Sequence, residues 1–234
     1  MTRSKLPAAS SPAEVERFLQ EARRPGGPVA QPLGRLLIAL DATASRQPSW
    51  DRACRLQADM FAQAASVGGL LVQLLWYRGI QDFGASSWHA EADALVVQMQ
   101  RVQCAGGLTQ IGRVLHHAQQ ATRSHRIRGL VFVGDCMEED PALLIRLAGE
   151  LGVLKVPVFL FQEGADPTAS RTFAEIASLS GGAHCRFDQG SAAQLRELLG
   201  AVAVYAAGGA RALAELGRRE GGMARRLAHQ LGER

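Results

Sequence analysis

Three oxygen-bearing side chains, Asp41, Thr43 and Ser45, stand at alternate positions just after the apolar run Leu36–Leu40. The run has the length and composition of a buried strand, and ligands of open α/β sheets bind beyond the carboxyl ends of the strands. A hard divalent cation needs several oxygens that converge from a small region. The spacing therefore predicts that this loop contributes to a cation site.

Two later segments offer further oxygen donors. Thr109 follows the glycine-rich stretch Gly106–Leu108, and Asp135 follows the apolar run Gly129–Gly134. All the donors are hydroxyl or carboxylate oxygens, without imidazole or thiolate, and such a set suits Mg²⁺, Mn²⁺ or Ca²⁺. We expect the donors of the three segments to meet at one edge of a parallel sheet.

From Leu33 onward, apolar strand patterns alternate with helical patterns, which predicts helices on both faces of the sheet. We expect a doubly wound, mostly parallel six-stranded α/β sheet of Rossmann-like type, with one antiparallel edge strand near Gln81–Trp88. The predicted strands are residues 35–40, 70–77, 81–88, 130–133, 156–161 and 183–187. The predicted helices are residues 50–67, 90–102, 110–124, 141–152, 167–179 and 191–206.

Three segments divide the chain by composition. Residues 1–32 form a leader with a short helix that starts at Ser11-Pro12, and it ends in the linker Arg23–Pro28. Residues 33–206 form the α/β domain. Residues 207–234 form a basic tail that is either helical or disordered, because glycines interrupt its two short apolar stripes.

The pattern Asp41-x-Thr43-x-Ser45, together with Thr109 and Asp135, resembles the metal-ion-dependent adhesion site (MIDAS) of von Willebrand factor A (VWA) domains. The resemblance covers about residues 33–206. It implies a Mg²⁺ held directly by Thr43, Ser45 and Thr109, with Asp41 and Asp135 acting through bound waters. Few direct ligands and retained waters favour Mg²⁺ over Ca²⁺. One coordination position would stay open for an acidic side chain of a partner.

Two positions depart from the family pattern. Thr43 stands where the family has Ser and keeps the hydroxyl, and Cys136 stands where the family often has Gly. These departures leave open a second interpretation, a metal-free VWA scaffold.

The resemblance implies a non-enzymatic module that binds a protein partner through a metal-bridged carboxylate. Arg46, Trp50 and Glu138 lie in or beside the expected binding loops and are candidate partner contacts. Alternative roles are core packing for Trp50 and, for the acidic run Glu138–Asp140, capping of the next helix.

A phosphohydrolase of the haloacid dehalogenase type is the competing enzymatic hypothesis, because Asp41 follows a first strand and Gly134-Asp135 occurs later. That family needs a second Asp where this chain has Thr43. It also needs a Lys before the Gly-Asp pair, and no lysine occurs between Lys5 and Lys155.

Bulk properties narrow the classes of function. The net charge is +4 and the arginines are scattered, so nucleic-acid binding is not expected. No run of about 18 apolar residues occurs, and the first thirty residues lack the apolar core of a signal peptide; we therefore expect a cytoplasmic protein without a membrane anchor. The four cysteines form no Cys-x-x-Cys pair, so neither zinc nor a dithiol site is expected. The sequence does not indicate an oligomeric state.

Overall fold

The computed structural model describes residues 33–43, 50, 51, 53, 56, 59, 60, 62–64, 69–188 and 191–232. The predicted leader and the candidate residues Ser45 and Arg46 lie outside these ranges. The compact unit that contains the described residues begins at Leu33.

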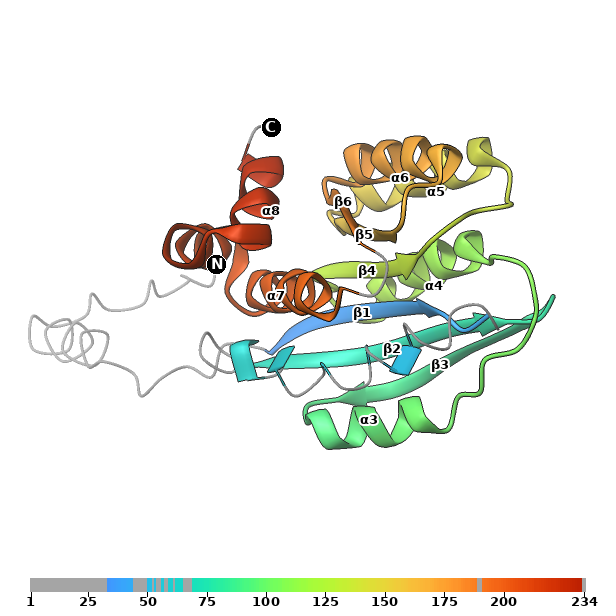
Figure 1. The fold of residues 1–234 in the computed structure, drawn as a ribbon, viewed down its shortest axis with the longest axis horizontal. Coiled ribbons are helices and arrows are strands. Elements are labelled where there is room, and N and C mark those ends of the chain that lie inside the picture. The colour runs from blue at the N-terminus through green and yellow to red at the C-terminus, as the bar shows by residue number, and fades with distance from the viewer. Residues whose placement is uncertain are drawn as a thin grey trace, which may run out of the picture. The chain divides into compact units, whose positions relative to one another are not determined.

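A six-stranded sheet of order β3-β2-β1-β4-β5-β6 forms the centre of this unit (Figure 1). All neighbouring strands are parallel except β2 and β3, which pair in antiparallel fashion. The predicted fold class, including the antiparallel edge strand, is therefore confirmed. The strands are β1 (Gly34–Asp41), β2 (Leu70–Arg78), β3 (Asp82–His89), β4 (Gly129–Gly134), β5 (Val158–Glu163) and β6 (Ala183–Phe187).

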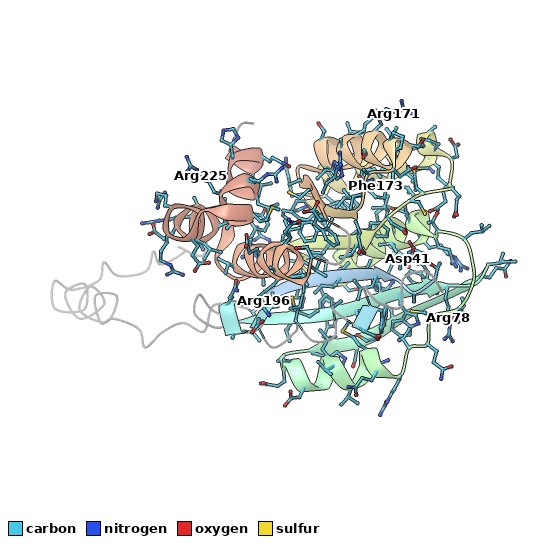
Figure 2. The ribbon with its side chains drawn as sticks, in the orientation of Figure 1. Asp41, Arg78, Arg171, Phe173, Arg196 and Arg225 are labelled. Carbon is cyan, nitrogen blue, oxygen red and sulfur yellow. The ribbon has the colours of Figure 1, made fainter. Side chains whose placement is uncertain are left out.

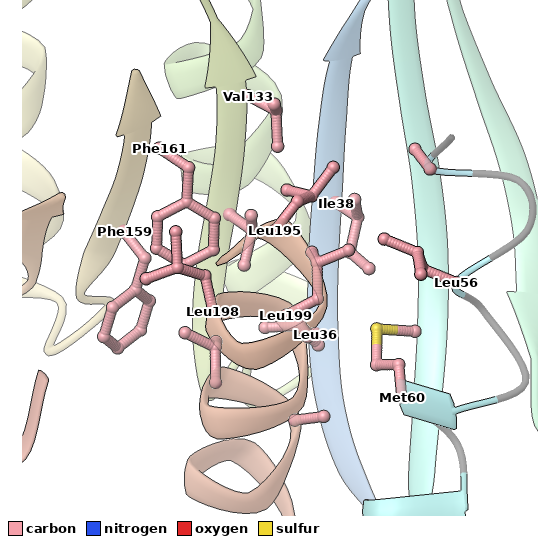
Figure 3. Close-up of a cluster of buried hydrophobic side chains, with 14 of the residues drawn as sticks. Leu36, Ile38, Leu56, Met60, Val133, Phe159, Phe161, Leu195, Leu198 and Leu199 are labelled. Atoms are coloured by element: carbon pink, nitrogen blue, oxygen red, sulfur yellow. The ribbon is translucent and has the colours of Figure 1, made fainter. Parts of the chain in front are cut away.

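Helices cover both faces of the sheet. Successive side chains of a strand point to opposite faces, so one strand contributes residues to the cores on both sides. In β1, Leu36 and Ile38 join a core cluster with α3, α7, α8 and the helical residues between Trp50 and Ala64 (Figure 3). Leu37 and Ala39 join a second cluster with α4, α5 and α6. The helices are α3 (Ala92–Gln100), α4 (Ile111–Ser124), α5 (Pro141–Val153), α6 (Pro167–Ser180), α7 (Ala192–Glu220) and α8 (Gly222–Gly232).

The C-terminal region is helical and belongs to the core. The expected domain end at residue 206 falls inside α7. This element consists of two helical segments that meet at a kink, where Gly209 has the non-helical angles φ 76° and ψ -173°, and the second segment ends at Glu220. Leu213 and Leu216 of α7 and Leu227 of α8 are buried in the same cluster as β1. A glycine-containing segment continues as helix here because its apolar side chains are buried by tertiary packing, which outweighs propensity.

By length and composition alone, α7 could also cross a membrane, which the sequence pattern did not suggest. Its apolar residues Leu195, Leu198 and Leu199 are instead buried against the sheet (Figure 3). α7 is therefore a core helix of this unit.

Both edge strands of the sheet depart from a regular, open edge. At the β6 edge, the side-chain amide of Gln230 in α8 accepts from the N–H of His184 and donates to its carbonyl, at 3.2 Å each. In β3, the register with β2 shifts by one residue in a bulge, where the Ser86 hydroxyl accepts from the Leu74 N–H of β2 at 3.0 Å. Bulges and covering side chains are how natural sheets protect their edges.

Candidate metal site at the end of the central strands

The candidate site lies at the carboxyl ends of β1 and β4, the two central strands. Leu40 pairs with Val133, so Asp41 at the end of β1 and Asp135 just after β4 leave the sheet side by side. The chain runs outward from β1 to β2 on one side and from β4 to β5 on the other. This is the topological switch point at which doubly wound sheets bind ligands.

A pocket of about 160 Å³ opens at this point. Three of the five predicted metal ligands, Asp41, Thr43 and Thr109, line it together. Of the other two, Ser45 lies outside the described residues, and Asp135 is not among the lining residues, although its neighbour Cys136 is. The remaining lining residues are Gly106, Gly107, Cys136 and Glu138.

Asp41 and Thr43 are joined by a local turn. The Thr43 N–H donates to Asp41 Oδ1 at 2.8 Å, which fixes the carboxylate of a side chain that is only 4% exposed. Asp41 is in register with Tyr77 of β2. Burial and the nearby Asp41 carboxylate raise the pKa of Tyr77 well above its ordinary value, so its hydroxyl is protonated at neutral pH.

Thr109 is held by Glu138 through two reciprocal hydrogen bonds. The Thr109 N–H donates to Glu138 Oε2 at 2.9 Å, and the Glu138 N–H donates to Thr109 Oγ1 at 3.1 Å. These bonds tie the Thr109 loop to the loop after β4. They set the position of Thr109, a residue that is 6% exposed.

Glu139 caps the start of α4. Its carboxylate accepts from the N–H groups of Ile111 and Gly112, the second at 2.9 Å, while the N-cap residue Gln110 provides no side-chain cap. Burial raises the pKa of Glu139, and the two amides partly offset that rise. Free amides at a helix start need such a partner. The sequence analysis missed this role because residues 111 and 139 are far apart along the chain.

Asp140 caps α5 as the sequence predicted. Its Oδ1 accepts from Ala142 N–H at 3.0 Å, next to Pro141 in the first turn. The acidic run therefore caps two helices: Glu139 caps the preceding helix α4, and Asp140 caps the following helix α5.

We expect Glu139→Ala to lower the free energy of unfolding by about 1–2 kcal/mol, because two helix-terminal amides lose their acceptor. Urea denaturation followed by circular dichroism measures the change. Glu175→Ala, an exposed position on α6, is the matched control and should stay within about 0.5 kcal/mol. Equal losses in the two variants would contradict the capping role.

The β2–β3 hairpin supports the Thr109 loop. Gly107 lies against Gly79, Leu108 N–H donates to the Gly79 carbonyl at 3.1 Å, and Gln110 Nε2 donates to the Arg78 carbonyl at 3.1 Å. Figure 2 shows Arg78 and Asp41 toward the same end of the sheet. Sequence reasoning missed these supports, which join segments about 30 residues apart.

Cys136 has a protonated thiol. Burial raises its pKa to about 12, with further contributions from the carboxylates of Asp135, Glu138 and Asp41. The thiolate is the nucleophilic form of cysteine, so this environment opposes a catalytic role.

The three candidate partner contacts have different positions. Trp50 is 3% exposed, belongs to the core cluster, and donates from Nε1 to the Met99 carbonyl at 3.2 Å. This placement matches the core-packing alternative and does not offer the ring to a partner. Glu138 is exposed and lines the pocket, and Arg46 lies outside the described residues.

The donor chemistry of the pocket fits a hard divalent cation. Asp41, Thr43, Thr109 and Glu138 present only hydroxyl and carboxylate oxygens. Within the described ranges, no three His, Cys, Asp or Glu side chains form a metal-binding group. A zinc-type site is thus not indicated in that part of the chain.

The fold matches solved VWA structures. A von Willebrand factor type A protein from Catenulispora acidiphila has a TM-score of 0.58 at 16% identity, over 75% of this chain and 43% of that one. The SpRpn10 VWA domain has a TM-score of 0.55 at 14% identity, over 76% of this chain and 98% of that one. An aerotolerance-related membrane protein from Bacteroides fragilis has a TM-score of 0.55 at 17% identity, over 71% of this chain and 96% of that one. No family model and no curated protein matches the sequence.

Proposed function

We propose that this chain, which has the fold of VWA domains, is a non-enzymatic module that binds a protein partner through a divalent cation. The ion in this proposal is Mg²⁺, or Mn²⁺ or Ca²⁺ in its place. Thr43, Ser45 and Thr109 would hold it directly, and Asp41 and Asp135 would act through waters. When bound, the cation offers an electrophilic position to a carboxylate of the partner.

The observation that supports the proposal most strongly is the convergence of Asp41, Thr43 and Thr109 on one pocket. Thr109 is distant from the other two in sequence, and the pocket lies at the switch point of the sheet. The side chains are also held in place before any ligand arrives, by the Thr43 amide on Asp41 and by Glu138 on Thr109. Preorganised donors lower the cost of ordering a site on binding.

Neutral hydroxyls as direct ligands suit recognition of an acidic group. They leave much of the charge of the cation uncompensated, so an incoming carboxylate is attracted. Asp41 and Glu138 supply nearby negative charge that would retain the cation while the partner is absent.

We expect the full chain to bind Mn²⁺, and Asp41→Ala and Thr109→Val to weaken this binding at least about tenfold, as loss of ligand-orienting groups does in metal sites. Isothermal titration and electron paramagnetic resonance of free Mn²⁺ measure the affinity. Thr172→Val, an equally buried threonine on α6, is the control for hydroxyl removal. Unchanged Mn²⁺ affinity in both site variants would refute the cation site.

A metal-free scaffold is the second candidate, and one observation favours it. Backbone amides already donate to oxygens of Asp41 and Glu138, so these two oxygens have partners without a cation. A chain that binds no Mn²⁺ in the same titration would support this alternative.

The phosphohydrolase hypothesis has less support. Thr43 stands where the general acid would be required, and among the described residues that line the pocket there is no Lys, Arg or His. The described lining therefore offers no basic side chain to stabilise a phosphate.

A further inference from the structure

A groove of about 570 Å³ begins next to the candidate metal pocket. The two share chain segments, because Glu138 lines the pocket while Glu139 lines the groove, and Thr109 of the pocket is followed by Gly112 and Arg113 of the groove. The groove lies among α4, α5 and β3. Its charged and apolar contacts include Arg113, Arg146, Phe83 and Leu143.

Arg113 is positioned by neutral acceptors. Its Nη1 donates to the Gln81 carbonyl at 2.7 Å and to Gln110 Oε1 at 2.8 Å. Gln110 is itself oriented, because its Nε2 donates to the Arg78 carbonyl. Within the described residues, no carboxylate forms an ion pair with Arg113. Its charge is therefore not neutralised there, and both described bonds use a single nitrogen of the guanidinium.

The other charges of the groove do not compete for this position. Glu139 is engaged with the amides of α4. Arg146 pairs with Glu150 at 2.8 Å, but the Arg146 side chain is 61% exposed. Exposed pairs of this kind contribute little and exchange easily. Arg146 can therefore add a second positive charge when an anion enters the groove.

Two exposed aliphatic side chains, called the apolar ridge, follow or precede lining residues of the pocket and of the groove along the chain. Leu108 precedes Thr109 and is 53% exposed, and Ile80 precedes Gln81 and is 76% exposed. The Leu108 N–H to Gly79 carbonyl bond holds the two backbone segments together. Exposed aliphatic side chains on a fixed backbone favour a contact with apolar groups of a partner.

We infer that the groove binds a second acidic side chain of the partner segment whose first acidic side chain binds the cation. This second carboxylate would accept from the guanidinium nitrogens of Arg113 other than Nη1, which makes both described bonds. The inference rests on the proposed function, which places the first acidic side chain at the cation. Between the two carboxylates, the segment would place an aliphatic residue over Leu108 and Ile80. Arginine binds carboxylates with two parallel hydrogen bonds, so a fixed Arg113 selects for the position of the second acid.

An acidic polypeptide fits this surface better than a nucleic acid. Asp41 and Glu138 line the metal pocket and Glu139 lines the groove. These carboxylates would repel a continuous phosphate backbone more than a peptide that carries two separated acidic residues. The ridge and Phe83 also present apolar area, which a peptide with aliphatic residues can cover.

Selection from a displayed library of short random peptides tests the inference on the full chain in Mg²⁺. Bound peptides are eluted first with EDTA and then with concentrated salt. We expect the EDTA fraction to be enriched in sequences in which Asp or Glu flank an aliphatic residue on both sides. Synthetic versions should bind Arg113→Gln about 10- to 100-fold more weakly than the parent, as expected for loss of a charge-assisted hydrogen bond. Arg113→Lys should recover part of the loss.

Matched variants control for charge and apolarity. The charge control is Arg123→Gln, in the last turn of the same helix, which should leave peptide affinity unchanged. Leu108→Ser should weaken peptide binding. Its control is Val97→Ser, at an exposed valine of α3, which should not weaken it. The Mn²⁺ affinity of Arg113→Gln should equal that of the parent, which separates this site from the metal pocket.

Several results would overturn the inference: recovery of no peptide, recovery of peptides without acidic residues, or equal binding to Arg113→Gln and to the parent. Tighter binding of phosphoserine versions than of the acidic peptides would assign the groove to phosphate instead. If Mn²⁺ does not bind but salt-eluted acidic peptides depend on Arg113, the proposed function fails and the acidic-peptide groove stands.

Discussion

A chain that ends at residue 206 is expected to be largely unfolded at 25 °C. The removed segment contains Leu213, Leu216 and Leu227, which are buried in the cluster that covers one face of the sheet. At about 2 kcal/mol for each buried leucine, their removal costs about 6 kcal/mol, compared with about 5–15 kcal/mol for the total stability of a typical domain. The loss also exposes the apolar side chains that these leucines cover.

Circular dichroism and urea titration of the shortened chain measure this effect. Leu227→Ala in the full chain provides a milder version and should cost about 2–5 kcal/mol, because the side chain is fully buried. A shortened chain with the parent's unfolding midpoint would instead support a domain boundary at residue 206.

Gly107→Ala should disrupt the candidate metal site although it removes no proposed ligand. A Cβ at this position would overlap the backbone of Gly79, which cannot move aside as a side chain could. The Thr109 loop would have to separate from the β2–β3 hairpin, at a cost of about 1–3 kcal/mol in stability. Thr109 would move with the loop, so we expect Mn²⁺ affinity to fall at least about tenfold.

Gly106→Ala is the control for this prediction, because a Cβ at Gly106 meets no atom within 4 Å. The neighbouring substitution has the same chemistry and should leave both stability and Mn²⁺ affinity close to those of the parent. Equal behaviour of the two variants would contradict the packing of Gly107 on Gly79. If Gly107→Ala lowers stability but leaves Mn²⁺ affinity unchanged, the packing of Gly107 on Gly79 does not affect the metal site.

The strands could be predicted from the sequence because a strand that is buried on both faces consists mostly of apolar residues. The run that ends at Leu40 and the run Gly129–Gly134 are apolar because both faces of a central parallel strand are covered. The switch point between them follows from strand order, and Asp41 and Thr109 line one pocket there.

The end of α7 was harder to predict. Gly209 adopts a φ of 76° within the helix, and glycine is the residue that tolerates this conformation. Local propensity indicates a break at such a position. The backbone does leave helical geometry at Gly209, and a second helical segment follows. That segment is stabilised by burial of Leu213 and Leu216, which depends on the tertiary structure and not on local propensity.

The supports of the candidate site were not predictable from local patterns. Glu139 serves a helix that begins 28 residues earlier, and the Gln110 side chain serves a hairpin 32 residues earlier. Such pairs leave no periodic signal in the sequence. Trp50 is a different case, because an aromatic residue after a binding loop fits both the surface and the interior.

The protection of both sheet borders has a consequence for how this molecule recruits others. Gln230 occupies both backbone groups of His184 in the middle of β6, and the bulge at Ser86 makes β3 irregular. Neither β-augmentation nor a swapped strand is then an easy mode of association. Recognition is instead confined to loops and grooves at the rim, where one substitution can alter the choice of partner without altering the scaffold.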